Sequence, residues 1–123
     1  MDQNALAQRI ARILYDKKAL DITVLNVGHL TVITDYMVIA SGRSALQVKS
    51  LADDVDEALA QEGVTLRARE GTGEGRWVVL DYSTVLVHIF HPEDRQFYHL
   101  ERLWDDGGNR VLLPFMDEEG KEA

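Results

Sequence analysis

Four histidines are the side chains of this sequence best suited to acid–base chemistry: His29, His88, His91 and His99. If residues 77–90 form a hairpin, His88 shares one strand face with Asp81, and a carboxylate can orient a general base in this way. The same face offers no nucleophile except Thr84. The rings of His88 and His91 diverge, because the two residues are three apart across a strand end. The sequence therefore predicts no catalytic residue and no metal ligand.

Two glycine-containing turns are the candidates for binding a phosphate. Residues 41–44, Ser-Gly-Arg-Ser, lie between a predicted strand and a predicted helix, and a helix N-terminus favours anions. Residues 71–75 contain three glycines but no lysine, and they precede a strand rather than a helix, so this turn is not expected to bind phosphate. A nucleotidyltransferase also needs paired carboxylates two residues apart on a strand, and no predicted strand contains Asp-X-Asp. An enzyme using residues 41–44 for phosphate and Asp35 or Asp81 for metal remains the alternative, but we expect no cofactor.

Hydrophobic periodicity predicts helices and strands in the order α-β-β-α-β-β-β-α. Asp2 or Asn4 is expected to cap the first helix, and Ser44 with Gln47 forms a capping box for the second. The predicted helices cover residues 4–19, 45–62 and 93–104, and the predicted strands cover residues 22–27, 36–41, 64–70, 77–81 and 85–90. Residues 36–70 suit a right-handed parallel crossover, whereas the end of the sheet is antiparallel. We therefore expect an α/β (α+β) fold with one mixed sheet of about five strands, flanked by helices.

Length, charge and composition set the broad class of protein. The chain has 123 residues, no cysteine and a formal net charge of −8. One domain is expected at this length, residues 1–106, followed by an acidic and flexible tail over residues 107–123. The absence of cysteine, of a long apolar run and of a signal-like start favours a cytoplasmic protein away from membranes. A pI near 4.8 disfavours direct nucleic-acid recognition and suits a basic protein partner.

The predicted hairpin of residues 77–90 has two different faces. If Asp81 pairs with Thr84 around a turn at residues 82–83, Trp77 lies opposite His88. Because strand side chains alternate, one face then holds only aliphatic residues: Val78, Leu80, Val85, Val87 and Ile89. We expect this face to pack against the helices.

The other hairpin face mixes aromatic, aliphatic and polar side chains, as the centres of protein interfaces do. Apart from Thr84, its members are Trp77, Val79, Asp81, Leu86, His88 and Phe90. We predict that these six residues bind a macromolecular partner, with the indole, the imidazole and the carboxylate facing outward. The alternative is that helix 93–104 covers this face and that its residues only pack. A homodimer formed through the same face is a third possibility.

Several ordered strings resemble the ribosomal silencing factor family (Iojap-like, DUF143-type). They cover residues 4–106 and include Ile33-Thr34-Asp35-Tyr36, Ala40-Ser41-Gly42, Trp77-Val78-Val79-Leu80-Asp81-Tyr82, Val87-His88-Ile89-Phe90 and Arg95 through Trp104. The resemblance implies a nucleotidyltransferase-like core that lacks the catalytic carboxylates. It also implies binding to the large ribosomal subunit through its ribosomal protein numbered fourteen. By blocking subunit association, such a protein represses translation under nutrient limitation. The family's hairpin Trp, Asp and His fall on Trp77, Asp81 and His88.

Overall fold

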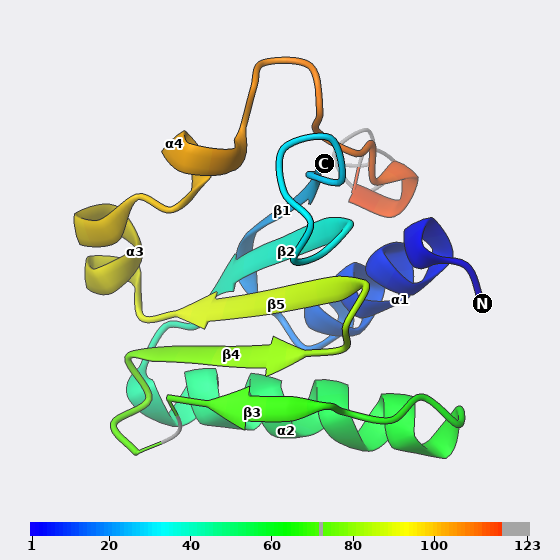
Figure 1. The fold of residues 1–123 in the computed structure, drawn as a ribbon. Coiled ribbons are helices and arrows are strands. Elements are labelled where there is room, and N and C mark those ends of the chain that lie inside the picture. Colours follow the sequence, from blue (N-terminus) through cyan, green and yellow to red (C-terminus); the bar gives the residue numbers. More distant parts are fainter. Residues whose placement is uncertain (72, 117–123) are drawn as a thin grey trace.

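The computed structural model describes residues 1–71 and 73–116, which form one five-stranded sheet with helices on both faces (Figure 1). The expected fold class is confirmed. The strands are β1 Leu20–Asn26, β2 Tyr36–Ser41, β3 Ala68–Glu70, β4 Trp77–Asp81 and β5 Val85–Phe90. The helices are α1 Gln3–Asp16, α2 Ala45–Gln61, α3 Pro92–Tyr98 and α4 Glu101–Trp104.

The strands follow the order β1-β2-β5-β4-β3, so the sheet is mixed as expected. Only β2 and β5 pair in parallel, and the other neighbours are antiparallel. β3 therefore runs parallel to β2, to which α2 connects it, but lies three positions away in the sheet. β3 is shorter than the strand predicted over residues 64–70, because its pairing with β4 begins only at Ala68. Just before it, the Arg67 amide donates to the Asp81 carbonyl at 2.8 Å.

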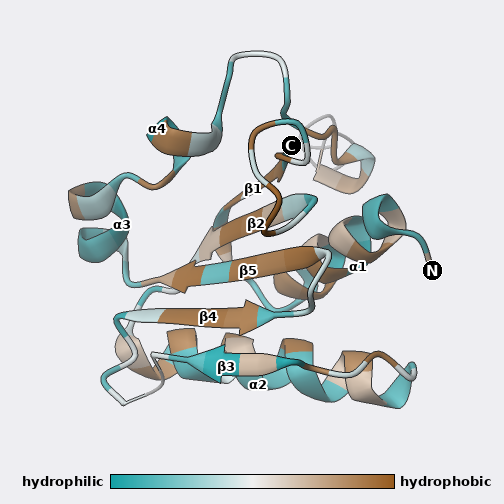
Figure 2. Cartoon of the chain, in the orientation of Figure 1, coloured by the Kyte–Doolittle hydropathy of each residue, from teal (hydrophilic) through white to brown (hydrophobic). Residues whose placement is uncertain are grey.

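α1 and α2 pack on one face of the sheet and close the main core. Apolar side chains at helical spacing point inward from α1, among them Leu6, Ile10 and Leu14. The aliphatic hairpin face lies against these helices, with Val78, Leu80, Val85, Val87 and Ile89 fully buried. Figure 2 shows the same concentration of apolar residues along β2, β4 and β5.

Both long helices begin at side chains that accept backbone hydrogen bonds. Asp2, and not Asn4, caps α1 by accepting from the Ala5 amide at 2.7 Å. Ser44 Oγ accepts from the Gln47 amide at 3.1 Å, which confirms the predicted cap of α2. Gly63 follows α2 with φ +81°, a left-handed conformation that glycine adopts without steric cost.

The turn between β4 and β5 differs by one residue from the expected one. The Tyr82 amide donates to the Val85 carbonyl at 2.9 Å, so the turn residues are 83–84 rather than 82–83. Asp81 Oδ1 accepts from the Ser83 amide at 2.7 Å and stabilises this turn. Trp77 therefore lies opposite Phe90, and His88 opposite Val79. The predicted partners were wrong but the two faces were right, because moving a two-residue turn by one position shifts the pairing by two.

The single helix predicted over residues 93–104 is two short helices. His99 adopts φ +50°, and its left-handed conformation ends α3. The chain turns there before α4 begins, so the apolar residues of the two helices do not form one stripe. Leu100 and Trp104 pack on the sheet, whereas Phe97 and Leu103 are exposed.

Residues 109–116 return to the domain, although a separate tail was expected from residue 107. Arg110 pairs with Leu25 at the free edge of β1, and the Val111 amide donates to the Val24 carbonyl at 2.8 Å. Leu113 is buried in the main core, and Phe115 stands 5.1 Å from the ring of Tyr15. The packed chain therefore extends beyond the boundary expected at residue 106. The acidic stretch over residues 117–123 lies outside the described residues.

Candidate binding surface

The outer face of the sheet, opposite α1 and α2, is covered over one part and open over the other. Leu25, Ile39 and Phe90, on β1, β2 and β5, are fully buried, and Leu100 and Trp104 pack against this group. The uncovered residues come from β4, from the start of β5 and from β3, where Ala68 and Glu70 are exposed beside Asp81 and Val79. The hairpin part of this surface, the open face, consists of Trp77, Val79, Asp81 and Leu86, all partly exposed.

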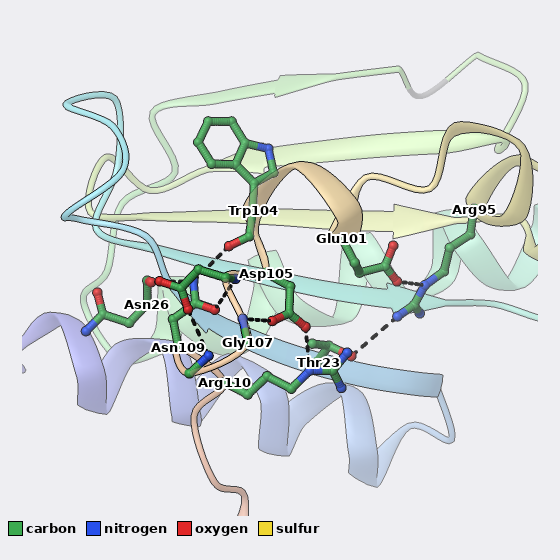
Figure 3. Close-up of polar contacts among 11 residues, drawn as sticks. Thr23, Asn26, Arg95, Glu101, Trp104, Asp105, Gly107, Asn109 and Arg110 are labelled. Carbon is green, nitrogen blue, oxygen red and sulfur yellow. Dashed lines mark hydrogen bonds and ion pairs between the residues drawn. The ribbon is translucent and has the colours of Figure 1, made fainter.

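An ion pair holds α3 and α4 against the sheet (Figure 3). Arg95 Nε lies 2.6 Å from Glu101 Oε1, and both side chains are largely buried, at 12% and 15% exposure. The same guanidinium donates to Ser41 Oγ at 3.0 Å and to Thr23 Oγ1 at 3.5 Å. Because one cation contacts both helices and two strands, it determines where α4 sits on the outer face.

Asn109 links the end of α4 to β1 through side-chain hydrogen bonds, which Figure 3 also shows. Its side-chain nitrogen donates to the Trp104 carbonyl at 2.7 Å and to the Asn26 carbonyl at 2.9 Å. Asn109 is buried, and nothing in the local pattern around it had singled it out. Nearby, the hydrogen bond from Arg110 holds the pKa of Asp105 below its usual value. These contacts fix Trp104, which covers the buried part of the outer face.

The loop between β1 and β2 is tied to the segment after α4. His29 Nε2 lies 2.6 Å from Asp106 Oδ2, and this hydrogen bond lowers the pKa of Asp106. The loop exposes three aliphatic side chains, Leu30, Val32 and Ile33. The hydrogen bond therefore holds an apolar loop beside the segment that follows α4.

Trp77 and His88 form a hydrogen-bonded pair at the border between the open and the buried parts. The indole Nε1–H donates to His88 Nδ1 at 3.1 Å. Because an indole nitrogen can only donate, Nδ1 is unprotonated and the proton of the neutral ring is on Nε2. His88 is only 7% exposed, and burial lowers its pKa to about 4. Its Nε2 is buried and has no hydrogen-bond partner among the described residues.

An aromatic row crosses from the buried to the exposed part of the surface. The ring of Trp77 stacks on Phe90 at 4.8 Å between centroids and lies 5.1 Å from Tyr98. Phe97 meets Tyr98 edge to face at 5.0 Å. Tyr98 and Phe97 are 53% and 81% exposed, so the row ends in solvent beside the open face.

The six hairpin residues predicted to bind a partner share one face, but they are not equally accessible. Trp77, Val79, Asp81 and Leu86 are partly open, whereas His88 and Phe90 are buried. The expectation that the imidazole faces outward was wrong, because the structure buries it. The alternative of a covered face therefore holds for one part of the surface only. Leu100 and Trp104 pack against the cluster that contains Phe90, and only tertiary packing reveals this.

The candidate catalytic groups are dispersed and engaged in structural contacts. Asp81 pairs with Arg67 at 3.5 Å and caps its own turn, and within residues 1–71 and 73–116 no hydrogen bond joins it to His88. His91 caps α3, and His99 ends it. Among residues 1–71 and 73–116, no three His, Asp or Glu side chains cluster closely enough to hold a metal ion. None of the helices in the described part of the chain is long and apolar enough to span a membrane.

Residues 41–44, the candidate phosphate turn, also serve the fold. Ser41 accepts from Arg95, and Ser44 caps α2. The Arg43 guanidinium donates to the Lys18 carbonyl at 2.8 Å. Gly42 packs so closely on α2 that an added Cβ would lie 2.9 Å from the Val48 nitrogen. Each polar side chain of the turn is therefore engaged within the domain.

Together, the fold and the surface define a small α+β domain with a partly open sheet face, and comparison with known proteins places it in a family. The family model described as "Ribosomal silencing factor during starvation" matches residues 1–123. A Bacillus subtilis protein named Ribosomal silencing factor RsfS is 35% identical over 106 residues, which are 86% of this chain and 90% of the relative. A Zymomonas mobilis protein of the same name is 37% identical, over 86% of this chain and 80% of the relative.

A crystal structure of a Chromobacterium violaceum protein superimposes with a TM-score of 0.83 at 34% identity, covering 92% of both chains. This chain belongs to the ribosomal silencing factor family.

Proposed function

We propose that this chain binds the large ribosomal subunit through its ribosomal protein numbered fourteen, and that it thereby blocks association with the small subunit. The chain would act in the cytoplasm and repress translation under nutrient limitation. Family membership supports this role, since the curated relatives are named ribosomal silencing factors. The mechanism is steric occlusion and requires no catalysis, which agrees with the structural use of the candidate catalytic residues.

The observation that carries the proposal is the open face with its aromatic row. Trp77 is partly exposed there and is held by aromatic neighbours on two sides. A few residues carry most of the binding energy of a typical interface, and tryptophan and tyrosine are enriched among them. Val79 and Leu86 add apolar area beside the indole, and Asp81 adds a carboxylate suited to a basic partner.

His88 and Phe90 lie on the same hairpin face, beneath the exposed part of the surface. Both are buried, so their proposed part in partner binding is to hold Trp77 rather than to contact the partner. The exposed rings of Phe97 and Tyr98 extend the surface toward α3. The partner is therefore expected to contact both the hairpin and α3.

Binding is tested by co-sedimentation of the purified chain with large ribosomal subunits. We expect Trp77→Ala to weaken binding by more than ~1 kcal/mol, which is at least about fivefold. Leu46→Ala is the matched control, because Leu46 is 79% exposed on α2, away from the open face. A folded Trp77→Ala variant that binds like the wild type would remove the proposed anchor.

The steric mechanism is tested by following subunit association by light scattering. Large subunits loaded with the wild-type chain should associate less with small subunits, and the Trp77→Ala variant should restore association. Normal association despite saturated binding would contradict the mechanism. Two further measurements address the alternatives. Heat on titrating nucleoside triphosphate with Mg²⁺ would favour an enzyme, and sedimentation at several concentrations would reveal a homodimer.

A further inference from the structure

We propose that His88 is a positioning residue, which fixes the indole ring of Trp77 for partner binding and does not itself contact the partner. The inference rests on the proposed binding function and adds to it the role of one buried side chain. It follows from the hydrogen bond between Trp77 and His88 Nδ1 and from the burial of the imidazole, including Nε2.

Neither nitrogen of His88 is available to a partner. Nδ1 accepts the indole hydrogen of Trp77 at 3.1 Å. Nε2 is buried within the domain, although it has no acceptor among the described residues. A partner could reach it only if neighbouring parts of the domain moved. The imidazole can therefore act on binding only through Trp77.

Stacking alone does not determine how the indole ring is rotated. The ring of Trp77 contacts Phe90 at an interplanar angle of 28° and Tyr98 at 42°. Turning the indole over about its Cβ–Cγ bond would keep a ring face against Phe90, but it would move Nε1 away from His88, and the directional hydrogen bond disfavours this. The bond to His88 therefore selects one orientation, and with it the edge of Trp77 that the open face presents.

The state of the imidazole suits this role at neutral pH. Burial disfavours the charged ring, so His88 stays neutral and Nδ1 keeps its lone pair. β4 and β5 place Val79 opposite His88, and Ile39 of β2 pairs with it on the other side. The aromatic neighbours are Trp77 and Phe90, so none of these contacts carries a formal charge. The hydrogen bond should therefore persist throughout the physiological pH range.

Two variants separate a positioning role from a direct contact. His88→Asn can keep an acceptor, because the asparagine oxygen is attached to Cγ as Nδ1 is in histidine. His88→Leu removes the acceptor and fills the site with an apolar side chain of similar length. The chain has two tryptophans, so Trp77→Phe identifies the indole N–H resonance of Trp77 in a ¹H–¹⁵N spectrum.

We expect His88→Leu to shift the Trp77 indole resonance toward that of a solvent-exposed indole and to speed its hydrogen exchange. Binding to large ribosomal subunits should weaken about fivefold, as for the loss of one hydrogen bond. His88→Asn should largely restore both readouts. In a Trp77→Phe background, which has no indole donor, His88→Leu should have little further effect on binding.

Several results would overturn the inference. An unchanged indole resonance in His88→Leu would show that the hydrogen bond does not hold the ring. An equal loss of binding in the Trp77→Phe background would show a direct contact by His88. If His88→Leu does not fold, the imidazole tautomer of the wild-type protein provides the test instead. A proton on Nδ1 would refute the proposed hydrogen bond, because Nδ1 could then not accept from the indole. A wild-type chain that fails to bind large subunits would refute the proposed function, and the indole resonance would still report separately on positioning.

Discussion

The indole of Trp77 donates a hydrogen bond diagonally across the hairpin to His88, although neither residue lies opposite the other. Trp77 is paired with Phe90, and His88 with Val79. Side chains on one face can interact diagonally when one of them is long. The pair links an exposed aromatic residue to a buried titratable one, and stability and surface geometry are therefore coupled.

The burial of His88 makes stability depend on pH. An unfolded histidine binds a proton below pH ~6.5, whereas folded His88 remains neutral down to about 4. In this window the unfolded state binds more protons, so the free energy of unfolding falls as the pH falls. The His88 contribution to this loss is about 3 kcal/mol between pH 7 and 4.

The measurement compares urea unfolding of the wild type and of His88→Asn over this pH range. The wild type should lose about 3 kcal/mol more than the variant, because the carboxylates titrate in both proteins. A difference in unfolding free energy that stays constant with pH would show that the pKa of His88 is not depressed.

The Arg95–Glu101 pair should contribute strongly to the placement of α4. Glu101→Leu leaves a largely buried guanidinium without its carboxylate, so we expect a loss of about 3 kcal/mol in thermal or chemical unfolding. The double variant Arg95→Leu/Glu101→Leu should lose less than this, because it leaves no unpaired charge. Asp16→Asn, which breaks the exposed Arg12–Asp16 pair, is the control and should change stability by less than ~1 kcal/mol. A double variant less stable than the single one would contradict this account.

Two neighbouring leucines test whether the chain after α4 belongs to the domain. Leu113 is 8% exposed in the main core, whereas Leu112 is 78% exposed. Leu113→Ala should lower the unfolding free energy by about 2–3 kcal/mol, through lost burial and a residual cavity. Leu112→Ala should change it by less than ~0.5 kcal/mol. Equal effects in denaturant unfolding would mean that residues 109–116 do not pack as described.

Gly71 holds the β3–β4 connection close to the backbone of Trp77. It has φ +79°, and an added Cβ would lie 2.0 Å from the Trp77 carbonyl oxygen. Gly63, with φ +81° and no atom within 4 Å of an added Cβ, serves as the control for the backbone conformation alone. Gly63→Ala should cost about 1 kcal/mol.

Gly71→Ala should cost more than ~2 kcal/mol, because a steric clash adds to the left-handed conformation. Thermal unfolding of both variants gives the comparison. The Gly71 variant should also weaken binding to large subunits, since the clash displaces the backbone of the proposed anchor. Similar stability of the two alanine variants would show that the connection can move aside.

Local sequence patterns were enough to predict the mixed sheet, the two long helices and the two faces of the hairpin. Alternation along β4 and β5 separated Val78 and Leu80 from Trp77 and Val79, whichever of the two turns formed. The cap at Ser44 and the glycine at position 63 marked the ends of α2. These features depend on residues close in sequence, and so a pattern can reveal them.

Only the tertiary structure decided which part of the outer face stays open. The left-handed turn at His99 separates α3 from α4. Hydrogen bonds from Arg95 and Asn109 then hold α4 against β2 and β1, which are far away in sequence. Phe90 is buried beneath Leu100 and Trp104, and His88 is also buried, whereas Trp77 remains partly exposed although all three share one face of the hairpin. The burial of a residue depends on contacts from several segments that are distant in sequence. The spacing of residues within one hairpin therefore does not predict which of them are buried.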